Sequence, residues 1–514
     1  MNKARYWLMA CACLAWPACS YAQDIEKEFE EFAKQQQQAF DDFKNKADAE
    51  FETFLRQTWE EYNAFAPIPV PTRPEPVNPV EFEKDRPQLP PVEIKPGKLK
   101  VPESPVPGMP ESTGPDVRKP DLPDMADMPA PGIYIPGLPY TPIQIPTPTV
   151  QPGRAVFRTE VDFYGTSFLV DLDAVEDLEL KGNKEGNVAD AWKAVCKQPY
   201  EQLLKDCLTL KKEKRLSDWA YLLLTKRIGM QLYGAERPNE VVFLQMFLLS
   251  KSGYKVKLAK IDNRLKLMVA TAGTIYSTPY LLIDGDKYYV FEPDPDSSLQ
   301  IYTYKRNFAE AKNLVSLSLS QVPAFDEQAL TRTLTPSTKA VTVQTTVNRN
   351  LIDFYRDYPQ CDVALHYHTP MSERLRGSLY PALKQAIEGK SQKDAANLLL
   401  NFVQTAFEYQ TDGDQFGYEK PFFPDETFFY PYCDCEDRAM LYATLVKDLL
   451  GLKAILLDYP NHIAAAVCFD EDIPGDYVVL GDSTRYLVCD PTYIGAPIGV
   501  CMDQYKGVSP EVIR

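Results

Sequence analysis

Histidine is scarce in this 514-residue chain, which has three, His366, His368 and His462. Structural zinc sites need four Cys or His ligands, usually in pairs at short spacing. Cys433 and Cys435 are one residue apart, which is not the two-residue spacing of such pairs, and no second pair accompanies them. We therefore expect no metal and no other cofactor.

Excess positive charge and long apolar runs are also lacking. The net charge is −17 and no basic stripe offsets it, which argues against nucleic acid as a partner. After residue 22, no stretch is long and uncharged enough to span a bilayer, and the apolar run near Leu445 is interrupted by Lys447 and Asp448. The length predicts two or three domains joined by linker.

Residues 1–22 have the features of an export signal. Lys3 and Arg5 form a basic start, an apolar run extends from Trp7 to Ala18, and small residues lead to a cleavage site after Ala22. We expect an exported protein, in the periplasm or at the cell surface.

Cys19 offers an alternative, in which the mature chain begins with a lipidated cysteine. The preceding Trp16-Pro17-Ala18 is a poor match to the small residues that such processing requires, so we favour cleavage after Ala22. The even number of remaining cysteines permits disulfides outside the cytoplasm, but their spacings form no framework pattern. These cysteines are Cys196, Cys207, Cys361, Cys433, Cys435, Cys468, Cys489 and Cys501.

Aromatic residues recur every eleven positions in residues 23–66. Eleven residues make three helical turns at about 3.67 residues per turn, so the repeat predicts a coiled-coil-like helix with a nearly straight aromatic stripe. Through residues 25–65 this helix could self-associate or bind a partner helix; the alternative is a surface helix that packs on its own domain. The two series are Phe29, Phe40, Phe51 and Tyr62, and Phe32, Phe43, Phe54 and Phe65.

Residues 67–154 contain more than half of the 44 prolines of the chain. Proline interrupts strand ladders and helices and favours the polyproline II conformation. We therefore expect a disordered, proline-rich linker that acts as a spacer.

The rest of the chain alternates apolar helices with β-branched runs and contains an internal repeat. Residues 239–259 and 437–457 share a helix, a glycine C-cap (Gly253 and Gly451) and a strand, at a constant offset of 198 positions. We predict an α+β fold of two tandem modules, residues 155–335 and 336–514. The second module carries an extra loop, residues 412–432, ahead of its helix.

Three residue types required for nucleophilic acyl chemistry lie at the ends of elements in the second module. Cys435 begins a helix, His462 opens an apolar strand and Asp490 ends another. The histidine would take the thiol proton and the carboxylate would orient the histidine. Free N–H groups at the helix start favour the thiolate, whereas Glu436 and Asp437 oppose it by like charge.

The pattern resembles the transglutaminase-like superfamily over about residues 395–497. The resemblance is based on three motifs in order along the chain: Cys435-Glu436-Asp437, His462 and Asp490-Pro491-Thr492. The resemblance implies papain-like modules, with the helix of the nucleophile on an antiparallel sheet, and a thioester acyl-enzyme. The sequence shows no clear counterpart of the family's oxyanion-stabilising side chain. The backbone N–H of Cys435 would supply one donor, and Tyr432 is our candidate for the second.

The first module carries Arg237, Arg264 and Glu292 at the three corresponding places, so we predict a degenerate copy without this chemistry. A structural salt bridge is the favoured interpretation of these three, and substrate presentation or packing is the expected role of the module.

Four more polar residues have simpler expected roles. Asp434 would be the N-cap of the helix that Cys435 begins, and Cys433 an ordinary loop cysteine. His366 and His368 would share one face of a strand as exposed polar residues.

The leading hypothesis is an exported cysteine hydrolase or acyltransferase that acts on a protein or peptide, with hydrolysis favoured over crosslinking. The rival is a non-catalytic binding or assembly protein in which both modules are scaffolds.

Overall fold

The computed structural model describes residues 31–71, 79–100, 141, 143, 145–146 and 158–514, apart from positions 33, 37, 40, 263, 293–299 and 482. The predicted export signal, Cys19, Phe29, Phe40 and linker residues 101–140 lie outside the described residues. The chain divides into two compact units. One is Met1–Trp59 with Leu178–Gln198, and the other is Glu60–Asp177 with Pro199–Arg514.

The first unit contains the helix of the eleven-residue repeat, whose described residues are helical from residue 31 to residue 55. It packs against α2 (Glu185–Cys196), where the Phe51 ring meets the Trp192 ring edge-on with centroids 4.8 Å apart. Phe32 and Phe43, from the second aromatic series, are each 58% exposed. Part of the aromatic surface therefore packs on the chain itself, and part remains exposed.

The expectation of a helix up to residue 66 fails after Leu55. Glu60–Asn63 is strand β1, which pairs antiparallel with β10 (Gln300–Thr303) in the second unit. Phe65 follows it and stacks on Tyr280, with ring centroids 5.2 Å apart. The aromatic repeat continues into the strand, but a non-local partner decides its conformation.

The second unit is a mixed α+β structure with two large sheets. The first sheet has the strand order β1-β10-β6-β7-β9-β8. Its remaining strands are β6 (Val256–Ile261), β7 (Arg264–Ala270), β8 (Tyr280–Ile283) and β9 (Asp286–Val290), and the preceding helices are α3 (Glu201–Glu213), α4 (Asp218–Tyr233) and α5 (Pro238–Lys251).

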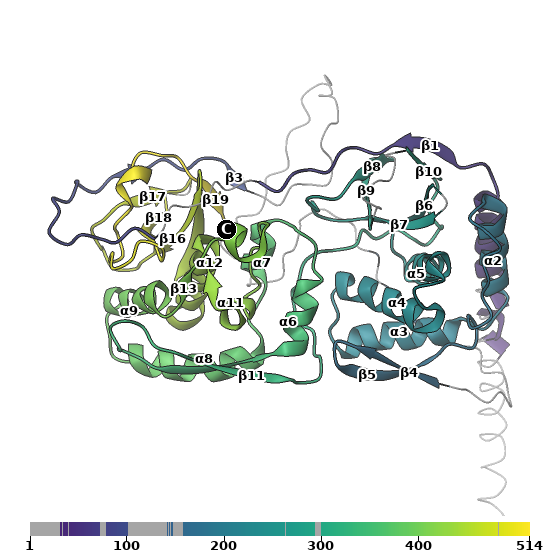
Figure 1. The fold of residues 1–514 in the computed structure, drawn as a ribbon, viewed down its shortest axis with the longest axis horizontal. Helices are drawn as coiled ribbons and strands as arrows, with labels where there is room; N and C mark the ends of the chain where they lie inside the picture. Colours follow the sequence, from purple (N-terminus) through teal and green to yellow (C-terminus); the bar gives the residue numbers. More distant parts are fainter. Residues whose placement is uncertain are drawn as a thin grey trace, which may run out of the picture. The chain divides into compact units, whose positions relative to one another are not determined.

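The second sheet has the order β2-β17-β18-β16-β15-β19-β3. Helix α12 packs across β15 and β16 and against α9, and together they bury a large apolar core (Figure 1). The strands are β2 (Glu93–Ile94), β3 (Leu99–Lys100), β15 (Lys453–Tyr459), β16 (His462–Cys468), β17 (Tyr477–Val479), β18 (Arg485–Cys489) and β19 (Glu511–Ile513). The helices are α6 (Arg349–Arg356), α7 (Val363–His368), α8 (Glu373–Ile387), α9 (Gln392–Thr405), α10 (Asp412–Phe416), α11 (Glu426–Phe429), α12 (Cys435–Leu450) and the 3-10 helix η2 (Asp503–Tyr505).

The predicted boundary between residues 335 and 336 falls inside a hairpin. Strands β11 (Ala329–Leu334) and β12 (Val343–Asn348) pair along their whole length, and α8 packs on β12. The hairpin is one structural element, so its first strand belongs with the C-terminal part. Two further pairs are β4 (Arg158–Phe163) with β5 (Thr166–Asp171), and β13 (Glu408–Tyr409) with β14 (Tyr432–Cys433).

The internal repeat is present in the structure at the expected offset. Helix α5 with β6, β7 and β9 corresponds to α12 with β15, β16 and β18, and β7 and β16 begin at the aligned residues Arg264 and His462. The predicted C-cap Gly451 is left-handed, with φ +69°, which suits glycine.

Some of the described residues of the proline-rich segment form β-strands. The expectation that the whole segment is a disordered spacer is therefore wrong for these residues. β2 adds a parallel strand beside β17, and β3 adds one beside β19 at the opposite edge. Both strands are two residues long, which matches the tolerance of proline-flanked segments at sheet edges. No helix among the described residues has the length and apolar character needed to cross a membrane.

Candidate active site

His462 and Asp490 form a buried pair. The Nε2 atom of His462 lies 2.8 Å from Oδ2 of Asp490, and each side chain is 2% exposed. With Nε2–H donating to the carboxylate, a neutral imidazole keeps Nδ1 as its basic nitrogen. The structure therefore brings together the two residues that the sequence predicted as base and orienting acid.

Local structure fixes both residues. His462 is the first residue of β16 because a two-residue turn, Pro460-Asn461, closes the hairpin with β15, and Asn461 adopts φ +73° there. The other carboxylate oxygen of Asp490, Oδ1, accepts hydrogen bonds from the backbone N–H groups of Thr492 and Tyr493 at 2.9 and 3.2 Å. The carboxylate is therefore held from both sides.

Cys435 is the first residue of α12 and is 1% exposed. Its thiol donates to Oε2 of Glu436 at 3.1 Å. Helix α12 packs on β16, the strand that begins with His462. The nucleophile candidate therefore sits at a helix N-terminus, as predicted, with its proton directed to a neighbouring carboxylate.

Tyr505 of η2 packs against His462. Its ring stacks on that of His462, with centroids 5.0 Å apart and planes inclined by 15°. Burial raises the pKa of Tyr505, and the nearby Cys435 and Asp490 add to the rise. Nothing in the sequence singled out this tyrosine, because it follows Asp490 in an irregular C-terminal segment.

A cluster of buried carboxylates surrounds the start of α12. One oxygen from each of Asp412, Asp434 and Glu436 lies within 4.8 Å of the others. Burial raises the pKa of Asp412 to about 10, with Glu436 and Asp437 contributing, and raises that of Asp434 well above its usual range. Oδ1 of Asp434 has no hydrogen-bond partner among the described residues.

Such a cluster can be neutralised by protons or by a cation. Carboxylate oxygens are the ligands that Ca²⁺ and Mg²⁺ use, so within the described part of the chain these three residues could hold a divalent ion. The expectation of no metal rested on the spacing of Cys and His residues. Sequence spacing could not reveal the carboxylate cluster, because Asp412 belongs to the extra loop, far from Asp434 in sequence.

Asp434 occupies the N-cap position of α12 but makes no capping hydrogen bond with its side chain. The expectation of an ordinary N-cap is therefore wrong for the side chain, which is directed to the carboxylate cluster instead.

Two buried residues that the sequence did not predict donate hydrogen bonds to backbone carbonyls near the site. The side-chain amide of Gln404, on α9, donates to the backbone carbonyls of Asp490, Tyr493 and Ala496 at 3.2, 2.8 and 3.0 Å. Arg438, 1% exposed on α12, donates to the carbonyls of Gln404 and Phe407. Both act through backbone atoms, which leave no residue-type signal in a sequence.

The residues just before the helix lie in β14. Tyr432, the oxyanion candidate, pairs with Glu408 and is half-buried, and its role stays a prediction. Cys433 is buried in this strand, so the expectation of a loop cysteine is wrong; burial raises its pKa to about 11. All eight cysteines of the expected mature chain are free thiols.

Two of the three degenerate positions of the first copy form ion pairs with residues outside this set. Glu292 pairs with Lys226, and Arg237 lies 3.4 Å from Glu240. Arg264 is exposed at the start of β7.

His366 and His368 lie on helix α7 rather than on a strand, and neither is an exposed residue. His366 is 5% exposed and contacts the Cys361 sulfur at 3.5 Å. Burial lowers the pKa of His368. Asp362 is the N-cap of this helix, and its side chain accepts a hydrogen bond from the N–H of Ala364. This cap favours a helix, although the two-residue spacing of the histidines had suggested a strand.

Comparison with known proteins yields no relative. No protein-family model matches the chain, and neither the curated proteins nor the solved structures contain a significant match.

Proposed function

We propose that the chain is an exported cysteine-dependent acyl-transfer enzyme that cleaves an amide bond through a thioester, with hydrolysis favoured over crosslinking. The observation that carries the proposal is the buried 2.8 Å pair of His462 and Asp490, on a sheet against which α12, the helix that begins with Cys435, packs through β16. The resemblance to transglutaminase-like modules supports the same assignment.

The reaction begins with transfer of the Cys435 proton to His462. Sulfur attacks the amide carbonyl carbon, the C–S bond forms, and the carbonyl oxygen becomes an oxyanion. Collapse of this intermediate breaks the C–N bond, and the imidazolium protonates the leaving amine. Water, deprotonated by His462, then releases the acid and restores the thiol.

The surrounding groups have distinct tasks in this cycle. Asp490 stabilises the imidazolium and holds its ring. The backbone N–H of Cys435, at the start of α12, is one oxyanion donor, and Tyr432 remains the candidate for another. Because the resting thiol donates to Glu436, activation includes redirection of its proton to His462.

The test is the pH dependence of Cys435 alkylation by iodoacetamide, followed by peptide mass spectrometry. We expect reaction well below pH 8 and a shift of the profile upward in His462→Ala. A profile like that of an ordinary thiol, with pKa about 8.5, in both proteins would overturn the proposal. Buried Cys433 in the same peptide provides an internal control.

A second assay identifies the acceptor. Wild type and Cys435→Ala are incubated with a labelled glutamine peptide, with and without a labelled amine. Ammonia release or cleavage that requires Cys435 supports hydrolysis, whereas conjugate formation supports transamidation.

The rival function is a non-catalytic binding or assembly protein. The observation in its favour is burial: Cys435, His462 and Asp490 are 1%, 2% and 2% exposed, so a substrate needs a conformational opening. An unperturbed Cys435 profile, together with no turnover of any peptide tested, would favour this function.

A further inference from the structure

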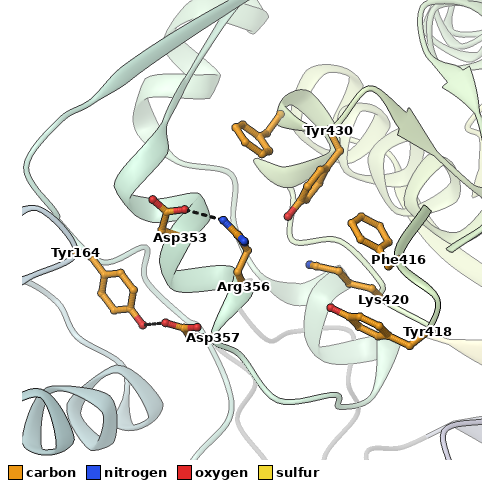
Figure 2. A pocket seen from close by; sticks show the side chains of 9 residues that line it. Tyr164, Asp353, Arg356, Asp357, Phe416, Tyr418, Lys420 and Tyr430 are labelled. Carbon is orange, nitrogen blue, oxygen red and sulfur yellow. Dashed lines mark hydrogen bonds and ion pairs between the residues drawn. The ribbon is translucent and has the colours of Figure 1, made fainter. Parts of the chain in front are cut away.

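A cavity of about 680 Å³ lies between the extra loop and helix α6. This volume falls within the range of about 300 to 1,000 Å³ that is typical of small-ligand sites. Figure 2 shows the residues that line it. They are Tyr164, Asp353, Arg356, Asp357, Phe416, Tyr418, Lys420, Phe429 and Tyr430.

The two walls differ in character. The extra loop supplies one wall, with the rings of Phe416, Tyr418 and Tyr430 around Lys420. The opposite wall is the end of α6, with Arg356. In Figure 2 the polar ends of Arg356, Lys420 and Tyr430 are directed toward the space between the walls.

Lys420 is a charged donor that is fixed in place. Its side chain is 12% exposed, and Nζ donates to the fully buried Glu426 at 2.7 Å. Burial alone would lower the pKa of Lys420, but Glu426 outweighs this effect and the pKa is raised. An ammonium has three N–H groups, so one ion pair leaves donor capacity at Nζ.

Arg356 also has donors to spare. Its Nη1 lies 3.3 Å from Asp353, and the side chain is 54% exposed. A guanidinium carries five N–H groups in a planar fork that suits a carboxylate.

The two acidic residues of the cavity already accept hydrogen bonds from the protein. Asp353 receives them from Arg349 and Arg356, and Asp357 receives one from the Tyr164 hydroxyl at 2.6 Å. Part of the acceptor capacity of the two aspartates is therefore used within the protein, whereas Arg356 and Lys420 keep donors for a ligand. The two aspartates also oppose a doubly charged anion such as phosphate, so a singly charged carboxylate fits best.

We propose that this cavity binds a carboxylate-bearing peptide, with the carboxylate between Arg356 and Lys420 and the adjoining side chain against Phe416, Tyr418 and Tyr430. Tyr430 precedes Cys435 by five residues, so its Cα lies within about 18 Å of the Cα of Cys435. As a substrate subsite, the cavity would select acidic peptides, and this part of the inference rests on the proposed function.

The test uses the full chain with Cys435→Ala, so that no peptide is consumed. Binding of acetyl-Ala-Glu-Ala-Tyr-amide is compared with that of the glutamine counterpart by isothermal titration calorimetry. We expect the glutamate peptide to bind about tenfold more tightly, as loss of a charged hydrogen-bonding group requires.

Matched variants locate the site. Arg356→Gln should abolish the preference for glutamate, whereas Arg374→Gln should retain it. Arg374 is the control because it pairs with Glu327 and its side chain is 53% exposed, against 54% for Arg356. Lys420→Met is made together with Glu426→Gln, so that no unpaired buried carboxylate remains, and should also abolish the preference.

Equal affinity for the two peptides, no binding of either at 5 mM, or equal effects of Arg356→Gln and Arg374→Gln would overturn the inference. The experiment does not depend on turnover. If Cys435 is unreactive in the alkylation test but the glutamate peptide binds selectively, the enzyme proposal fails and the binding site stands. If Cys435 is reactive but the two peptides bind equally, the binding site fails and the enzyme proposal stands.

Discussion

The ring of Tyr505 lies nearly parallel to that of His462, with centroids 5.0 Å apart. Tyr459 completes a cluster of three rings, with its centroid 4.9 Å from that of Tyr505 and 6.5 Å from that of His462. His462 is 2% exposed, whereas Tyr505 is half-buried in a short 3-10 helix. The imidazole is thus covered by an aromatic ring on an irregular surface segment.

Removal of that ring should expose the imidazole. We expect Tyr505→Ala to raise the rate of His462 modification by diethyl pyrocarbonate about tenfold, measured by peptide mass spectrometry. Tyr505→Phe keeps the ring and should leave the rate near that of the wild type. If both variants behave like the wild type, Tyr505 does not cover His462.

Gln404 should contribute to the stability of the fold around Asp490. Gln404→Leu deprives the carbonyls of Asp490, Tyr493 and Ala496 of their shared donor, which should cost on the order of 3 kcal/mol in the free energy of unfolding. Chemical denaturation measures this cost. Asn397→Ala is the control, because Asn397 also lies on α9 and binds the N–H of Ile498; it should cost less than half as much. A similar cost for both variants would contradict the special role of Gln404.

The repeat made much of the region around the candidate site predictable from the sequence. The repeated pattern of a helix, a glycine and two strands predicted that a helix begins at Cys435 and a strand at His462, as α12 and β16 do. This worked because local periodicity and turn residues determine those elements. The α+β class follows from the same pattern.

Other features depend on partners distant in sequence. β1 pairs with β10, and β2 pairs with β17, so neither the aromatic repeat nor the prolines could reveal those strands. Asp434 has the residue type of an N-cap, yet Asp412 from the extra loop brings it into a carboxylate cluster. Tertiary contacts, rather than local preference, determine these outcomes.

Lys257 should make stability depend on pH in the alkaline range. Burial lowers its pKa to about 7, in a site where the ammonium lies over the rings of Tyr288 and Tyr304. Between pH 7 and about 10.4 the unfolded chain binds this proton and the folded chain does not, so stability rises with pH over that range. Lys257→Met should therefore stabilise the protein at pH 7, by on the order of 3 kcal/mol, and the gain should vanish near pH 10.5.

Thermal or chemical unfolding between pH 6 and pH 10.5 tests this expectation. Lys260→Met is the control, since Lys260 lies half-buried on the same strand, β6. A gain for Lys257→Met that does not change with pH would mean that charge burial is not its origin.

The carboxylate cluster should have the opposite pH dependence. The pKa of Asp412 is about 10 in the folded protein, against about 3.9 in an unfolded chain. The folded state therefore holds a proton that the unfolded state has released, and stability falls as pH rises from about 4 toward 10. Asp412→Asn keeps an oxygen for the backbone N–H of Lys420 and cannot ionise. At pH 8.5 in chelator we expect it to melt about 3 °C above the wild type.

Calcium provides the second half of this experiment, because a cation can replace the protons in the cluster. At pH 8.5, millimolar Ca²⁺ should raise the melting temperature of the wild type by more than that of Asp412→Asn, which has lost one charged ligand. Asp414→Asn is the control: Asp414 is exposed on the same short helix α10, outside the cluster. If Ca²⁺ changes the melting temperature of all three proteins equally, protons alone neutralise the cluster. The melting temperatures measured in chelator then report the effect of this protonation on stability.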